Sequence, residues 1–135
     1  MTIQKIYPDA LAKPHGYAHV LVGTGSKLVC TSGQLAIDAD ENLVGGERDY
    51  RAQGYQAAGN VYAALEAAGA SAADVVRLMI YVVDPTADNL EQLYVGLGEA
   101  GAEAGAKATA TTLVGIAALS LPGAVVEIDA TALID

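Results

Sequence analysis

Apolar and polar positions along the chain follow two different periods. Between residues 49 and 68, apolar side chains recur every three or four positions, which predicts a long amphipathic helix. Residues 75–83 are rich in β-branched side chains and carry a single charge, so they predict a strand at the centre of a sheet. Residues 124–133 alternate between apolar and polar positions, which predicts a half-buried strand near the C-terminus.

Shorter patterns predict the remaining elements. Residues 20–22 and 28–31 read as two short strands that flank a glycine-bearing turn, and we expect them to pair as a β-hairpin. A second helix is expected through residues 90–97 and should fade in the glycine-rich stretch 98–105. A further strand is expected at residues 111–118.

Two local signals mark the end of the first helix and the start of the central strand. Gly69 is typical of a helix C-terminus, and Ser71 with Asp74 three residues later is typical of a capped turn. The order of elements predicts one α+β domain over residues 1–135, in which two helices pack on one face of a mixed sheet.

The composition adds a reason to expect an oligomer. The chain has 135 residues, of which 53% are hydrophobic and 17% charged, and it lacks Phe and Trp. Its core must therefore be built from Ala, Val, Leu, Ile and some tyrosine rings. Because the share of charged residues is below the usual quarter, we expect apolar surface that a second copy of the chain would cover.

The charge excludes several partners. A net charge of −9, with the seven Lys and Arg scattered singly, predicts no nucleic-acid partner.

Residues 108–126 carry no charge, but Pro122-Gly123 and several hydroxyl residues interrupt them, so we expect no membrane span. The N-terminal residues lack the pattern of a secretory signal, and Cys30 stands alone and is expected to be buried. We expect a cytoplasmic protein.

No metal or cofactor motif is found. His15 and His19 lie in a segment that contains Pro and Gly and have no neighbouring acidic cluster, which argues against zinc. Asp38 and Asp40 have the spacing that begins a calcium loop, but the other ligands are missing. Ser32 has no base beside it in the sequence, although the fold could still supply one.

Glu127 is the main candidate for chemistry, because it is an ionisable group within an apolar strand. Alternation places Val126, Ile128 and Ala130 on one face and Glu127 with Asp129 on the other. A polar strand face that meets solvent explains this pattern as well as a working carboxylate does, so the residues alone leave both interpretations open.

The sequence resembles the RidA/YjgF family of reactive-intermediate deaminases along nearly its whole length. Five segments carry the resemblance, in order and at matching spacing: residues 15–19 (HGYAH), 28–34 (LVCTSGQ), 65–77 (LEAAGASAADVVR), 80–84 (IYVVD) and 122–130 (PGAVVEIDA). The resemblance implies a chorismate-mutase-like fold of the bacillus type, assembled as a homotrimer with a small-molecule ligand in the clefts between subunits. It also implies a reaction without cofactor, in which water hydrolyses a 2-imino or enamine acid to a keto acid and ammonia.

The same resemblance assigns site residues. Glu127 takes the place of the strand glutamate that positions water, and Tyr17 that of the N-terminal tyrosine, so both are expected to be catalytic. Gly33 takes the place of the glycine that lines the cleft, and the neighbouring Ser32 is a candidate for substrate binding. The arginine that holds the substrate carboxylate in the deaminases is missing, and Thr111 stands in its position.

This substitution leaves three functions open. The first is a hydrolase of a small imine or enamine that is held without the arginine, in which Glu127 orients water and Thr111 binds the substrate by donating a hydrogen bond, with His19 or Lys107 as alternative donors. The second is a non-catalytic protein that binds a keto acid or a related metabolite, or regulates through it. The third, an endoribonuclease that inhibits translation, is disfavoured by the negative charge.

Overall fold

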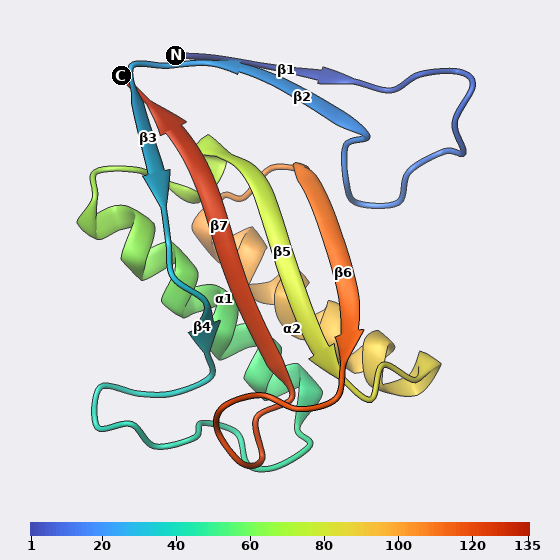
Figure 1. Cartoon of the computed structure of the whole chain (residues 1–135), viewed down its shortest axis with the longest axis vertical. Helices are drawn as coiled ribbons and strands as arrows, with labels where there is room; N and C mark the ends of the chain where they lie inside the picture. The colour runs from blue at the N-terminus through green and yellow to red at the C-terminus, as the bar shows by residue number, and fades with distance from the viewer.

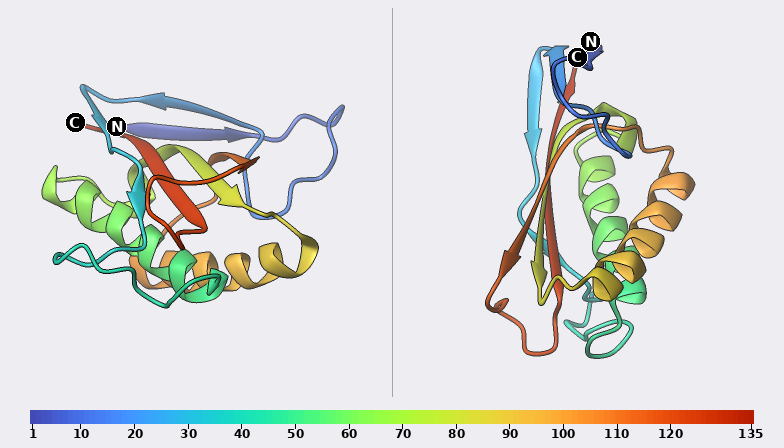
Figure 2. Two further views of the ribbon diagram at one scale, coloured as in Figure 1. Left: turned by 60° about the horizontal axis from the view of Figure 1, so that its bottom comes forward. Right: turned by 90° about the vertical axis from the view of Figure 1, so that its right-hand side faces the viewer.

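Two helices cover one face of a mixed sheet, and the opposite face of the sheet is open (Figure 1; Figure 2, right). The structure is a computed structural model and describes residues 1–135. In chain order, its elements are β1 (Thr2–Ile6), β2 (Val20–Thr24), β3 (Lys27–Cys30), β4 (Gln34–Leu35), α1 (Tyr50–Ala67), the 3₁₀ turn η1 (Ala72–Asp74), β5 (Val75–Val83), α2 (Ala87–Ala104), β6 (Ala110–Ile116) and β7 (Val126–Ile134). This confirms the predicted arrangement of a mixed sheet with two helices on one face.

The main sheet has the order β3-β7-β5-β6, with β4 also paired to β7. β5 lies between β7 and β6, antiparallel to the first and parallel to the second, so its predicted central place is confirmed. A register shift interrupts the pairing with β7 between Val75 and Arg77. The long contact between β5 and β7 brings Tyr81 opposite Glu127 and Met79 opposite Asp129.

Small apolar residues fill the space between the sheet and the helices. Ala57, Val61 and Leu65 of α1 are almost fully buried, as the helical spacing predicts. They join Val82 of β5 and Ile128 of β7 in one cluster of 17 buried residues. The core therefore contains the Ala, Val, Leu and Ile side chains that the composition requires, and Tyr50 is the one tyrosine within it.

The helices approach each other closely where glycine allows it. A Cβ atom placed on Gly96 of α2 would lie 2.1 Å from the carbonyl oxygen of Arg51 of α1, which is too close for any side chain. Gly54 of α1 lies in the same way against Leu93, whose Cδ1 atom would be 2.7 Å from an added Cβ. Backbone therefore packs against backbone at this crossing.

Three expectations from the sequence are wrong. The strand at residues 20–24 pairs with β1, which the sequence analysis did not predict, and β3 pairs with β7. The hairpin does not form because β7 offers β3 a ladder of four residue pairs inside the main sheet. α2 does not fade after Gly98 but continues to Ala104, because Ala100 is buried against the core, and the left-handed Gly105 then ends it. Cys30 is exposed, since β3 is an edge strand.

Other local predictions are confirmed. Gly69 adopts a left-handed conformation just after the C-cap of α1, and Ser71 and Asp74 form a capping box at η1. Neither helix is long and apolar enough to cross a membrane.

Candidate functional site

Glu127 lies on the open face of the sheet, near the end where β7 begins. Along β7, Val126, Ile128 and Ala130 are buried under the helices, whereas Glu127 and Asp129 are half-buried on the other face. The strand alternation therefore places the candidate carboxylate where a ligand or a second subunit could reach it.

Gly33 forms the floor beneath Glu127. Residues 31–33 lead from β3 into β4, and the pairing of Leu35 with Glu127 brings this segment beside the start of β7. A Cβ atom on Gly33 would lie 2.2 Å from Oε1 of Glu127 and 2.8 Å from its Cδ. The carboxylate therefore rests directly on the glycine backbone, in space that any side chain at residue 33 would occupy.

Ser32 is next to this floor and is exposed. Its carbonyl oxygen accepts a hydrogen bond of 3.3 Å from the side-chain amide of Gln34, which helps to fix the turn into β4. The structure thus brings Ser32, Gly33 and Glu127 together, as the resemblance implied for a common site.

Tyr81 and Asp129 share the open face with Glu127, and the sequence analysis did not single them out as site residues. The negative charge of Asp129 raises the pKa of Tyr81, and burial and the charge of Glu127 act in the same direction, while Arg77 lowers it. The phenol of Tyr81 therefore keeps its proton to a higher pH than an ordinary tyrosine does. Alternation in residues 77–81 could have placed Tyr81 on a face, but only the pairing with β7 shows which residues it meets.

Thr111 lies on the other face of the sheet. Residues paired directly across two strands share a face, and Thr111 pairs with Leu78, which packs against the core. Its hydroxyl donates a hydrogen bond of 3.1 Å to the carbonyl of Thr109. Within one chain, the structure therefore does not bring Thr111 to Glu127.

The next residue, Thr112, shares the open face. It pairs with Met79, and its hydroxyl accepts a hydrogen bond of 3.0 Å from Nη2 of Arg77. Arg77 is thus the cation of this part of the sheet, but it lies four residues before Tyr81, about 13 Å along β5 from the position opposite Glu127. Glu127 forms no ion pair with Arg77 or any other cation of the chain.

Tyr17 lies at the opposite end of the molecule from Glu127. It belongs to the segment between β1 and β2, where its half-buried ring meets His19 edge-on at 5.4 Å between centroids. The neighbouring Ala18 donates its N–H to the carbonyl of Thr109, just before β6 begins. Because β6 runs parallel to β5 and Glu127 pairs with the far part of β5, one chain does not bring Tyr17 and Glu127 together.

The ring of His19 is already engaged within the chain. Its Nε2 atom lies 2.6 Å from the carbonyl oxygen of Ala12, at hydrogen-bonding distance. Across the chain, no group of three or more His, Cys, Asp and Glu side chains is arranged to hold a metal ion.

Two hollows in the surface lie away from Glu127. One of about 260 Å³ lies between α1 and α2, and one of about 430 Å³ lies beside the first turn of α1, next to Arg48 and Asn89. We assign the candidate site to Glu127 and not to these hollows, because the Glu127 carboxylate lies directly against the backbone of Gly33, with Tyr81 and Asp129 on the same open face. A cleft over that face requires a second body to close it.

Comparison with known proteins supports the fold and shows the family of the chain. The family model described as endoribonuclease L-PSP matches residues 8–134. The chain is 34% identical to YyfB from Yersinia pestis, a conserved Rid family protein of unknown function, with a TM-score of 0.87 and coverage of 99% of this chain and 100% of that one. No curated protein matches the chain significantly.

Two further crystal structures belong to the same group. A Mycobacterium tuberculosis member of the YjgF/YER057c/UK114 family is 33% identical, with a TM-score of 0.60 and coverage of 88% of this chain and 87% of that one. The YjgF protein of E. coli is 26% identical, with a TM-score of 0.69 and 87% of each chain covered. These similarities confirm the predicted chorismate-mutase-like fold.

Proposed function

The chain belongs to the Rid/YjgF family, described as endoribonuclease L-PSP, and from this premise we propose that it hydrolyses a small reactive imine or enamine on the open face of its sheet. The observation that carries the proposal is the placement of the Glu127 carboxylate on the side-chain-free floor of Gly33. This contact fixes a general base at an accessible surface and leaves space beside it for a water molecule and a small substrate.

The reaction follows from the groups around Glu127. The carboxylate orients a water molecule and takes its proton as the oxygen attacks the carbon of the C=N bond. The C–N bond then breaks, the nitrogen leaves as ammonia after protonation, and a carbonyl remains. Tyr81, whose pKa Asp129 raises further above neutral pH, supplies a hydrogen-bond donor to the leaving nitrogen or to the developing alcohol.

A homotrimer would complete the site. Apolar side chains are left on the open face, among them Leu28, of which 66% is exposed, and the half-buried Met79 and Val114. Packing the open faces of three copies against one another would cover these side chains and stabilise the assembly. It would also let Tyr17 of one copy reach Glu127 of another, which a single chain cannot achieve.

The charges around Glu127 favour a substrate without a carboxylate. A charge-assisted hydrogen bond from an arginine contributes roughly 1.5–3 kcal/mol, so its loss lowers the rate with a 2-imino acid by one to two decades. Thr111 makes a local backbone bond instead, and Arg77 is held by Thr112. With Asp129 close by, the field at Glu127 favours neutral or cationic imines, such as those formed by oxidation of simple amines.

The test is an assay in which an oxidase generates the imine in place and ammonia release is followed. An amine oxidase supplies uncharged or cationic imines, and an amino-acid oxidase supplies 2-imino acids. We expect faster hydrolysis of the amine-derived imines, and a fall of about 100-fold in Glu127→Gln. Glu91→Gln, an exposed carboxylate on α2, serves as the matched control and should retain full activity. Full activity in Glu127→Gln would refute the proposed role.

Because the arginine of the deaminases is missing, a second candidate is a protein that binds a metabolite without turnover, a keto acid or a related molecule held by groups other than an arginine. Saturable calorimetric binding of 2-ketobutyrate, together with no hydrolysis of any imine, would favour this binding role over the hydrolase. The endoribonuclease activity in the family description is the weakest candidate, because a net charge of −9 opposes binding of a phosphate backbone.

A further inference from the structure

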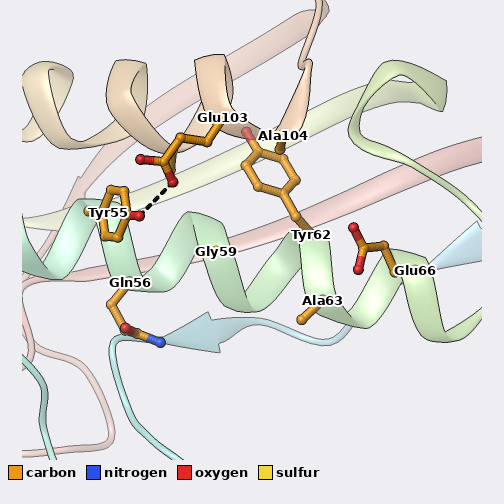
Figure 3. Close-up of a pocket in the computed structure, with 9 residues that line it drawn as sticks. Tyr55, Gln56, Gly59, Tyr62, Ala63, Glu66, Glu103 and Ala104 are labelled. Atoms are coloured by element: carbon orange, nitrogen blue, oxygen red, sulfur yellow. Dashed lines mark hydrogen bonds between the residues drawn. The ribbon is translucent and has the colours of Figure 1, made fainter.

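A hollow of about 260 Å³ lies in the helix layer, on the side of the sheet away from Glu127 (Figure 3). Its lining comes from α1 between Tyr55 and Glu66 and from the last turns of α2, and the floor consists of glycine and alanine. Two tyrosines and two glutamates stand around this floor: Tyr55, Tyr62, Glu66 and Glu103.

Gly59 creates the hollow. Tyr55 and Tyr62 are seven residues apart on one face of α1, about 10 Å along the helix axis, and Gly59 lies between them. A Cβ atom added to Gly59 would meet nothing within 4 Å. The helices are pressed together at Gly96, but next to Gly59 no side chain fills the gap between the two tyrosine rings.

The lining of the hollow is negatively charged and aromatic. The hydroxyl of Tyr55 donates a hydrogen bond of 2.6 Å to Oε2 of Glu103, which fixes both groups at the rim (Figure 3). Glu66 follows Tyr62 by one helical turn, so its carboxylate stands next to the second ring. No Lys, Arg or His lines the hollow, so neither carboxylate is paired with a cation there.

We propose that this hollow binds a small organic cation, an ammonium group that carries a few carbon atoms. The faces of two tyrosine rings attract a cation, and two carboxylates without ion pairs add to the attraction. The small floor residues accept the apolar part of the ligand, and the hollow has room for a molecule of choline size. This site is separate from Glu127, so its occupation does not depend on the proposed hydrolysis.

A pair of probes of nearly equal shape isolates the contribution of the charge. Choline carries a quaternary ammonium group, and 3,3-dimethylbutan-1-ol has a neutral carbon in the same place. We expect choline to shift the amide resonances of residues around Gly59 in a saturable titration, with an affinity at least fivefold higher than that of the neutral alcohol. Equal affinity for the two probes, or shifts confined to other parts of the chain, would overturn the proposal.

Three variants locate the binding. Gly59→Leu fills the hollow and should abolish choline binding, while Glu103→Gln keeps an acceptor for Tyr55 but removes a charge and should weaken it about fivefold. Glu91→Gln, on α2 but outside the lining, should bind choline as the wild type does. Should Gly59→Leu unfold, Glu103→Gln still decides the matter, because unchanged choline affinity in that variant contradicts a site at Glu103.

Discussion

The two faces of β7 differ in kind, although their residues alternate along a single strand. Val126, Ile128 and Ala130 are buried in a core where many apolar side chains would serve. Glu127 and Asp129, one residue away in each case, face outward beside Gly33 and Tyr81. The covered face contributes to the stability of the fold, and the open face carries the candidate site.

Two glycines differ in the same way, Gly96 in the helix layer and Gly33 on the open face. Gly96 is needed because the backbone of α1 occupies the space of any side chain, so it serves the packing of the helix layer. Gly33 is needed because the side chain of Glu127 occupies the space of an added side chain, so it serves the position of the candidate carboxylate. The backbone of Arg51, next to Gly96, cannot move away from an added side chain. The carboxylate of Glu127, next to Gly33, is the flexible end of a side chain and can move.

The largest effect is expected when the covered face is changed. Ile128→Ala removes buried methyl groups from the core and should lower the free energy of unfolding by about 3 kcal/mol. Asp129→Ala, its neighbour on the open face, should change the free energy by less than about 0.5 kcal/mol. Urea denaturation at a fixed protein concentration measures both. Equal losses in the two variants would show that the open face is as tightly packed as the covered one.

A smaller change should follow at the floor of the site. In Gly33→Ala the added methyl group overlaps the Glu127 carboxylate and displaces it, so imine hydrolysis should fall at least tenfold. The free energy of unfolding should fall by less than about 1 kcal/mol, because the displaced group is the end of a side chain.

Gly98→Ala is the matched control for this substitution. A Cβ atom on Gly98 meets nothing within 4 Å, and alanine favours the helix, so this variant should gain about 0.5–1 kcal/mol in stability. Its activity should equal that of the wild type. If Gly33→Ala hydrolysed imines as fast as the wild type, hydrolysis would not depend on the position of the Glu127 carboxylate. That result would contradict the proposed role of Glu127.

The long periodic elements of the fold could be predicted from the sequence. α1, β5 and β7 each carry a pattern long enough to specify their type, and alternation alone placed Glu127 on the outer face. β1, the partner of β2 and the true end of α2 were missed, because they depend on contacts with residues distant in the sequence. β3 pairs with β7 and not with its neighbour β2, and no local signal reveals this choice.

The site could be predicted only in part, for the same reason. The resemblance brought Gly33 and Glu127 together, and the structure places them in contact. The register between β5 and β6 decides whether Thr111 or Thr112 shares the face of Glu127, and a single sequence does not contain this register. Tyr81 and Asp129 emerged as neighbours of Glu127 only through the pairing of β5 with β7.

The smallest expected effect concerns the pKa of Tyr81. Asp129 raises it most, burial and Glu127 add to the rise, and Arg77 opposes it. Since the pKa in the folded state lies above the ordinary value of 10.0, the stability that Tyr81 contributes is fully present below pH 10.0. This stability is lost as the pH rises through the folded-state pKa, because the unfolded chain then gives up the tyrosine proton more readily.

Asp129→Asn removes the largest cause, so Tyr81 should lose its proton at a lower pH than in the wild type. The titration is followed by NMR of ring-labelled tyrosine, with the Tyr81 signal assigned from Tyr81→Phe. Asp88→Asn, an exposed site in the first turn of α2, should leave the titration unchanged. An unchanged titration in Asp129→Asn would mean that the two side chains do not interact. Tyr81 would then titrate without Asp129 as a partner, and the open face would lose the interacting tyrosine and carboxylate that distinguish it from the covered one.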